Sequence, residues 1–186
     1  MLERLLQFLI AGLLVFVSAH AVAEGTTIRT FPIAEHGNLQ LSAPQSWPVQ
    51  TRMGGQRQAP TIAFGPEDDA TYQVLITPLP HARKSEGAAD AVSVKQMVQL
   101  AAADAKAQAV EKTLSVKELR AGAHVGYYFS ATDRAPLQSE YRYMTQGMFS
   151  LGEVVVAFTI LTNDGYEHVV PAALTMIKNA VQLKDL

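Results

Sequence analysis

A pattern of alternating apolar and polar residues runs from residue 113 to residue 162 and constrains the fold more than any other feature of the sequence. It divides into four strand-like segments, at 113–120, 125–132, 140–149 and 153–162. The connections are short and carry turn residues such as Gly122 and Gly152, so consecutive strands should pair as antiparallel neighbours. Parallel strands would need crossovers of about a dozen residues, usually helices. The pattern therefore predicts an antiparallel sheet and excludes a doubly wound parallel fold.

The last of the four segments is apolar at almost every position from residue 154 to residue 160. Such a run is typical of a strand that is covered on both faces, so we expect this strand to be central. Five shorter strand-like runs precede it in the sequence, near 28–33, 39–42, 49–53, 61–64 and 72–77. Pro78 and Pro80 should end the fifth run, because proline cannot donate a ladder hydrogen bond.

A helix is expected between these two groups of strands, from Ser93 to about Ala109. Ser93 with Gln96 three residues later predicts a capping box, in which each side chain satisfies a free backbone donor. The residues that share one face at helical spacing are apolar and mostly small or flexible. They are Val94, Met97, Val98, Ala101 and Ala105.

A second helix is expected over residues 166–182. Its regular part should begin at about Val169, because Pro171 is tolerated only in the first turn. The expected buried stripe consists of Val170, Ala173, Leu174, Ile177 and Val181. Together these elements predict an α+β domain over residues 24–186, with helices packed on the faces of an antiparallel sheet.

The N-terminal residues 1–23 have the pattern of a cleavable secretory signal peptide. An apolar run at 5–17 is followed by the small residues Ala21 and Ala23, which predict cleavage after Ala23, and cleavage after Ala21 is a second frame. The run is shorter than the ~20 apolar residues of a membrane-spanning helix. We therefore expect a periplasmic or secreted protein without stable membrane insertion after cleavage. The chain has no cysteine, which excludes disulfides and a lipid anchor on that residue.

Charge and motifs limit the function classes further. The formal net charge is −2 and no run of Lys or Arg is present, so we expect no nucleic-acid partner. The sequence lacks a Gly-x-Ser-x-Gly motif, and Gly54-Gly55 lacks the residues of a phosphate-binding loop. His36, His81, His124 and His168 are scattered singly and are expected at the surface, and Glu67-Asp68-Asp69 is expected to be a solvated turn. We therefore expect no metal, no cofactor and no catalysis.

Aromatic residues provide the only candidate binding surface in the sequence. Trp47 is expected to fill the core. The densest aromatic and cationic group consists of Tyr127, Tyr128, Tyr141 and Tyr143 with Arg142. Half of these side chains should face outward because side chains alternate along a strand. Cross-strand pairing alone would also account for the group. The candidate binding residues are Tyr128, Arg142 and Tyr143.

The segment Leu39-x-Leu41-x-x-Pro44-x-x-Trp47 resembles the opening strand and Pro-x-x-Trp signature of the PsbP-type superfamily. The order of the expected elements is also similar to that family. The resemblance implies an α/β/α sandwich, as in the extrinsic photosystem II subunit, a Ran-binding nuclear import factor and small exported bacterial proteins. It also implies docking to proteins without catalysis.

Three functional hypotheses follow. The first is an exported, non-enzymatic domain that docks to an envelope protein partner or to itself. The second is a carrier that holds a small apolar ligand between the sheet and the helix at 94–109, where alanine and methionine leave room. The third is a hydrolase whose reactive residues come together only in the folded chain.

Overall fold

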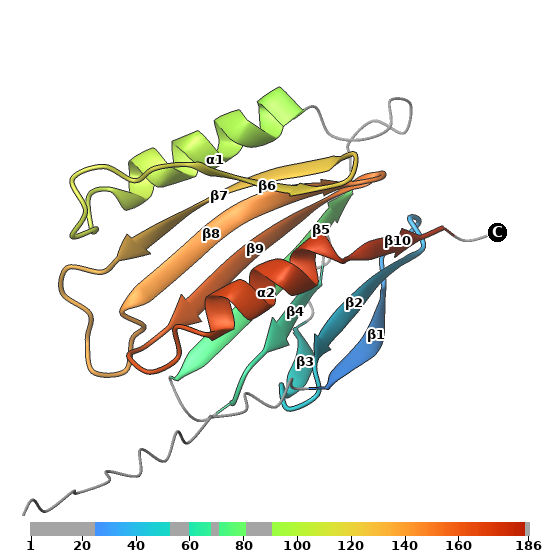
Figure 1. The fold of residues 1–186 in the computed structure, drawn as a ribbon, viewed down its shortest axis with the longest axis horizontal. Coiled ribbons are helices and arrows are strands. Elements are labelled where there is room, and N and C mark those ends of the chain that lie inside the picture. The colour runs from blue at the N-terminus through green and yellow to red at the C-terminus, as the bar shows by residue number, and fades with distance from the viewer. Residues whose placement is uncertain (1–24, 53–59, 68–70, 81–90, 185–186) are drawn as a thin grey trace, which may run out of the picture.

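The computed structural model describes residues 25–52, 60–67, 71–80 and 91–184 (Figure 1). The expected signal peptide at 1–23 lies outside the described residues. So do Gly54-Gly55, Asp68-Asp69 and His81. Within the described residues, the chain forms two antiparallel sheets and two helices, so the fold is mainly sheet.

The larger sheet has seven strands in the order β3-β4-β5-β9-β8-β7-β6, and all neighbours are antiparallel. The strands are β3 (Val49–Arg52), β4 (Thr61–Phe64), β5 (Tyr72–Pro80), β6 (Lys117–Ala121), β7 (His124–Thr132), β8 (Tyr143–Leu151) and β9 (Val154–Thr162). The run from β6 to β9 is the expected four-strand meander. β9 lies between β5 and β8, which confirms the central position expected from its apolar sequence.

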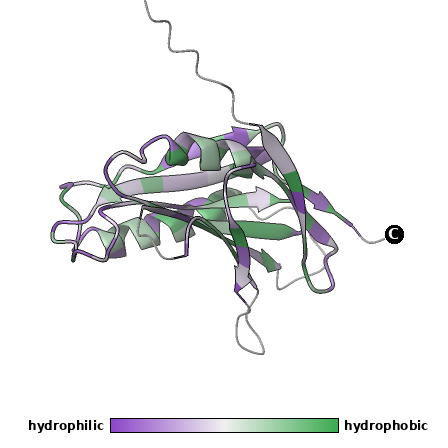
Figure 2. Cartoon of the chain, turned by 90° about the horizontal axis from the view of Figure 1, so that it is seen from below, coloured by the Kyte–Doolittle hydropathy of each residue, from purple (hydrophilic) through white to green (hydrophobic). Residues whose placement is uncertain are grey.

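The smaller sheet has the order β1-β2-β10, with β1 (Thr26–Pro32), β2 (Asn38–Pro44) and β10 (Val181–Leu183). The two helices are α1 (Ala91–Ala105) and α2 (Val169–Lys178). α1 packs on β7 and β8, whereas α2 contacts β2 and the opposite face of the larger sheet. Figure 2 shows the two helices on opposite sides of the sheet.

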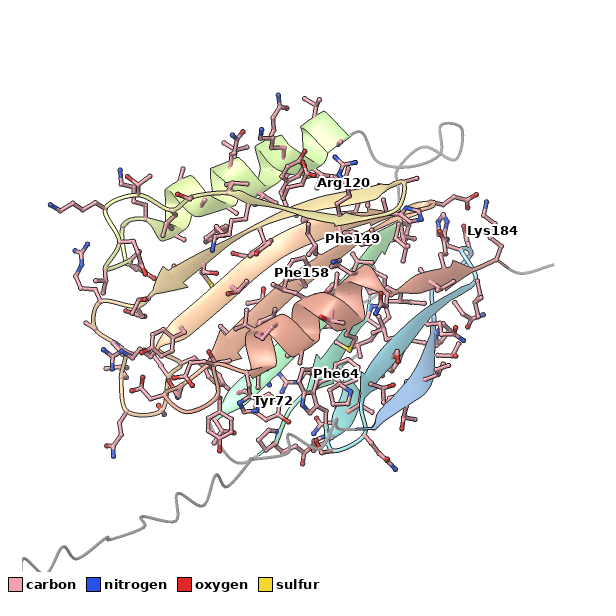
Figure 3. The ribbon with its side chains drawn as sticks, in the orientation of Figure 1. Phe64, Tyr72, Arg120, Phe149, Phe158 and Lys184 are labelled. Atoms are coloured by element: carbon pink, nitrogen blue, oxygen red, sulfur yellow. The ribbon has the colours of Figure 1, made fainter. Side chains whose placement is uncertain are left out.

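Alternation along β8 and β9 separates the two faces. Phe149 and Phe158 point toward α2 and the smaller sheet, and Phe64 joins them from β4 (Figure 3). Met148 and Val155 point instead toward α1. Burial of one large apolar side chain contributes about 1.5–3 kcal/mol, so the α2 side, which holds most of the buried large side chains, is the main core. Trp47 is 4% exposed and belongs to it, as expected.

β5 continues through Pro78 and Pro80, so the expected end of this strand at Pro78 is wrong. Both prolines pair with β9, opposite Val156 and Val154. β4 stops pairing with β5 at Ile76. The prolines therefore lie where β5 has a neighbour on one side only, and a missing backbone donor costs little there.

Several other expected boundaries are also wrong. α1 already includes Ala91, so Ser93 lies inside the helix and not at its N-cap, and the helix ends at Ala105. β6 begins at Lys117 and β8 at Tyr143, later than the alternation alone suggested. The residues before β8 are instead held by side chains, because the amide of Arg142 donates to Asn163 Oδ1 at 2.7 Å.

The C-terminal segment departs most from expectation. α2 ends at Lys178, and Val181 is 44% exposed in β10, where it pairs with β2. Gln182 fixes this strand: its Oε1 accepts a hydrogen bond from the Glu153 amide at 2.7 Å, and its Nε2 donates to the His36 carbonyl at 3.0 Å. The side chain of His36 is only 10% exposed, so its expected surface position is wrong.

No helix in the part of the chain that the structure describes is long and apolar enough to cross a membrane.

Candidate functional site

A hollow of about 190 Å³ opens between α1 and the larger sheet, and we call it the α1 groove. α1 forms one wall, and β4, β5, β7, β8 and β9 form the floor and the other wall. The described lining residues are Thr61, Leu75, Thr77, Met97, Val98, Ala101, Phe129, Gln146, Gly147, Met148, Ala157, Phe158 and Thr159. The groove lies at the place where the sequence suggested an apolar ligand could be held.

Small side chains leave this space open. Ala101 projects from α1 and Ala157 from β9, and neither fills the gap between the helix and the sheet. α1 packs on β7 and β8, where Val98 contacts Phe129 in a buried cluster. The helix therefore covers one half of this face of the sheet. The groove opens where its cover ends, over β5 and β9.

The chemistry of the lining is neutral. Among the described residues, no ionisable side chain lines the α1 groove. The hydroxyls of Thr61 and Thr77 lie 2.8 Å apart, and one donates a hydrogen bond to the other. Gln146 and Thr159 are the other polar side chains of the lining. Met97 and Met148 are flexible and polarisable and can adapt to an occupant. The groove therefore suits an uncharged group that is mainly apolar.

Exposed apolar side chains lie near the opening. Met97 lines the groove and is 40% exposed, and Leu100, one turn further along α1, is 67% exposed. Leu79 is 37% exposed and follows Leu75 and Thr77 on the same face of β5. Exposed apolar groups that surround a hollow are typical of a ligand or partner site.

The structure separates the three residues that the sequence singled out. Tyr128 packs against the main core, with Lys117 Nζ 6.0 Å from its ring centroid. It pairs with Gly147, which lies four residues along β8 from Tyr143, or about 13 Å. Arg142 and Tyr143 are neighbours at the other end of β8. The structure therefore brings Arg142 and Tyr143 together and places Tyr128 apart from them, half-buried against the core.

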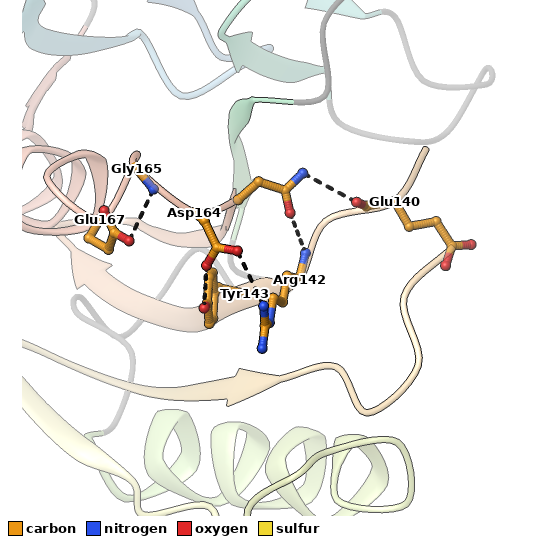
Figure 4. A network of polar contacts seen from close by, with 7 residues as sticks. Glu140, Arg142, Tyr143, Asp164, Gly165 and Glu167 are labelled. Atoms are coloured by element: carbon orange, nitrogen blue, oxygen red, sulfur yellow. Dashed lines mark hydrogen bonds and ion pairs between the residues drawn. The ribbon is translucent and has the colours of Figure 1, made fainter. Parts of the chain in front are cut away.

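Arg142 and Tyr143 belong to a surface network that joins the start of β8 to the turn after β9 (Figure 4). Asp164 accepts hydrogen bonds from Tyr143 Oη at 2.6 Å and Arg142 Nη1 at 3.2 Å. The Arg142 guanidinium carbon lies 5.5 Å from the Tyr143 ring centroid. The bond from Tyr143 lowers the pKa of Asp164, and the same bond raises the pKa of Tyr143. Arg142 therefore has two partners at the surface, the Asp164 carboxylate and the Tyr143 ring.

The strand contributions to the α1 groove could not be read from the sequence. The helix residues Met97 and Ala101 were noted there as small or flexible. Thr61, Thr77 and Ala157 are far from them in the chain and meet them only because β5 pairs with β9. The short side chain of Ala157 within an otherwise bulky strand was the only local signal.

Within the described residues, no group of three or more His, Asp or Glu side chains is arranged to hold a metal ion. No known protein family model matches the chain. No curated protein matches it either.

Proposed function

We propose that the chain is a non-enzymatic binding domain that holds a small apolar group in the α1 groove. The observation that carries this proposal is the hollow of about 190 Å³ with a neutral lining whose threonine pair is already hydrogen-bonded. An engineered apolar cavity of about 150 Å³ is large enough to bind benzene. The α1 groove is therefore the right size for one ring or a short alkyl group.

Binding of toluene, followed by ligand-observed NMR, tests this proposal. The variant Ala101→Phe places a ring in the groove and should abolish binding, because Ala101 lines it. The matched control is Ala103→Phe, at an exposed position of the same helix outside the lining. Equal toluene binding by both variants, or no binding by the unmodified domain, would contradict the proposal.

Docking to a protein partner, or self-association, is a second candidate function. The side chain of Arg142 is 51% exposed, and Asp164 and Tyr143 hold it in place. A preorganised arginine beside an aromatic ring loses little entropy when it binds, and such residues are enriched at interfaces. Affinity capture from an envelope extract with an Arg142→Ala/Tyr143→Ala variant tests this. Tyr128 is left intact because it packs on the core.

A specific partner that the unmodified domain retains and the double variant loses would support docking at this surface. Sedimentation of the unmodified domain and of the double variant tests self-association. Retention of the same partner, or the same oligomeric state, by both proteins would contradict a role for Arg142 and Tyr143.

We also propose that the domain is exported and that its architecture is a PsbP-like α/β/α sandwich. The apolar run and small residues of 1–23 support export. Helices on both faces of an antiparallel sheet, and the Pro44-to-Trp47 segment that begins at the last residue of β2, support the family resemblance. The mass of the protein from its native compartment tests export: an N-terminus at Glu24 or Val22 supports it, and the intact leader contradicts it.

A further inference from the structure

A second hollow of about 160 Å³ lies on the same side of the larger sheet, beside the C-terminal end of α1. Its lining includes Ala105 of α1, Met144 of β8 and Leu161 of β9. Arg142 and Asp133 also contribute to it. Like the α1 groove, it therefore lies between small helix residues and the β8–β9 pair.

The two hollows lie in line. Three consecutive cross-strand pairs face α1 along β8 and β9: Met148 with Ala157, Gln146 with Thr159, and Met144 with Leu161. The first two pairs line the α1 groove and the third lines the second hollow. On the helix, Met97, Ala101 and Ala105 follow one another at successive turns, over a length of about 12 Å.

Their combined size matters, because sites for whole small molecules usually exceed about 300 Å³. The α1 groove of about 190 Å³ and the second hollow of about 160 Å³ each fall below this value, so a site of that size requires a ligand that occupies both. Their arrangement in a row under one helix suits a narrow, unbranched molecule more than a compact ring system.

The two ends of this row differ in chemistry. The α1 groove ends near Met97, whose apolar side chain is 40% exposed. The second hollow ends at Arg142. Arg134 is close to the same end, because its Nη2 donates to the carbonyl of Ala109, another lining residue, at 2.9 Å.

Three acidic residues lie near this end, Asp133, Asp164 and Glu111, and each accepts hydrogen bonds from the protein. Glu111 accepts from the amide and the hydroxyl of the lining residue Thr132, at 3.0 and 2.7 Å. Asp133 Oδ1 accepts the amide of Ala135 at 2.9 Å, and Asp164 accepts from Tyr143 and Arg142. A guanidinium has five N–H donors in a planar fork that matches a carboxylate. The bond to Asp164 uses one nitrogen of Arg142, whose side chain is half exposed. The other donors of the fork can receive an anionic group.

Building on the proposed function, we propose that the two hollows together bind an unbranched alkyl carboxylate. Its tail lies along the β8–β9 pairs beneath α1 and enters the α1 groove, and its carboxylate meets Arg142. Each added methylene that enters the groove should tighten binding roughly fourfold. The gain should stop once the tail fills the groove.

Calorimetric titration of the full mature domain with hexanoate, octanoate, decanoate and decanol tests this assignment, with toluene as the reference ligand. Affinity should rise along the carboxylate series, and decanoate should bind at least tenfold more tightly than decanol. Arg142→Gln should remove that preference without changing toluene binding. Arg120→Gln, at an exposed arginine paired with Glu118 away from both hollows, is the matched control and should change neither.

The outcomes separate this inference from the proposed function. Toluene binding without a chain-length dependence, or equal affinity for decanoate and decanol, would overturn the inference and leave the apolar site in place. A decanoate affinity unchanged by Arg142→Gln would overturn the assignment of the carboxylate to this end. Absence of binding for toluene and for every chain would overturn both.

Discussion

Ala101 of α1 and Ala157 of β9 line the same hollow from opposite sides, one from the helix and the other from the sheet. A larger residue at either position would fill the space between the layers. The groove therefore exists because two short side chains, distant in sequence, face each other across the gap. This relationship can be tested from the sheet side independently of the helix.

Ala157→Leu should abolish toluene binding without destabilising the domain. Ala157 is only partly buried, so the added atoms enter open space and not a packed core. The free energy of unfolding should stay the same or rise slightly, because the leucine buries apolar surface. Toluene titration and urea unfolding measure the two effects. Thr30→Leu, on an exposed position of β1, is the control and should retain binding, and retained binding by Ala157→Leu would refute the relationship.

Phe158→Ala should lower the free energy of unfolding by about 3–5 kcal/mol. The side chain is 2% exposed and belongs to the main core between the larger sheet, α2 and the smaller sheet. Leu137 is 67% exposed, so Leu137→Ala should stay within about 0.5 kcal/mol of the unmodified domain. Equilibrium urea unfolding compares the two. Similar losses for both variants would contradict the core as described.

The hydrogen bond between Tyr143 and Asp164 should make stability depend on pH at both extremes. The folded pKa of Asp164 is lowered by this bond, so its contribution is present above the unfolded value of about 4 and is lost as pH falls through the folded pKa. The pKa of Tyr143 is raised by the same bond, so that contribution is present below about pH 10 and is lost as pH rises through the folded pKa.

Thermal unfolding across pH measures this dependence. Tyr143→Phe should lose stability at neutral pH and flatten the profile at both ends. Tyr128→Phe keeps the aromatic ring that packs on the core and should follow the unmodified profile. Parallel profiles for Tyr143→Phe and the unmodified domain would show that the bond contributes nothing.

Gln182→Ala should destabilise the C-terminal strand by about 1–3 kcal/mol, because it leaves the partly buried Glu153 amide and His36 carbonyl without their partner. Lys184→Ala removes only an exposed ion pair with Glu153 and should cost much less. Amide hydrogen exchange in β10 and β2 reports the difference. Equal protection in the two variants would contradict the role given to Gln182.

The sequence predicted the strands and turns that depend on residues close together in the chain. The apolar run at 154–160 predicted a central strand, and the short turns predicted the meander from β6 to β9, both of which are confirmed. The C-terminal end of α2 could not be predicted, because Val181 continues the helical apolar stripe. Pairing of β10 with β2 decides its position, and that partner lies far away in the sequence.

The candidate site was likewise predictable only where its residues are close together in the chain. The sequence indicated a small and flexible helix face at Met97 and Ala101, which lines the α1 groove. Tyr128 was grouped with Arg142 and Tyr143, because alternation gives two faces but does not say which one the core covers. The core lies on the side of Tyr128 because α2 and the smaller sheet pack there. That arrangement depends on contacts between distant segments.

The methionine methyl groups give the most direct test of the α1 groove, since they sample both sides of the sheet. Met97 and Met148 line the groove, whereas Met176 belongs to α2 and is buried in the main core on the opposite side of the sheet. In a spectrum of methyl-labelled methionines titrated with toluene, the signals of Met97 and Met148 should shift together and that of Met176 should stay fixed. A shift confined to Met176, or no shift at saturating toluene, would contradict the account.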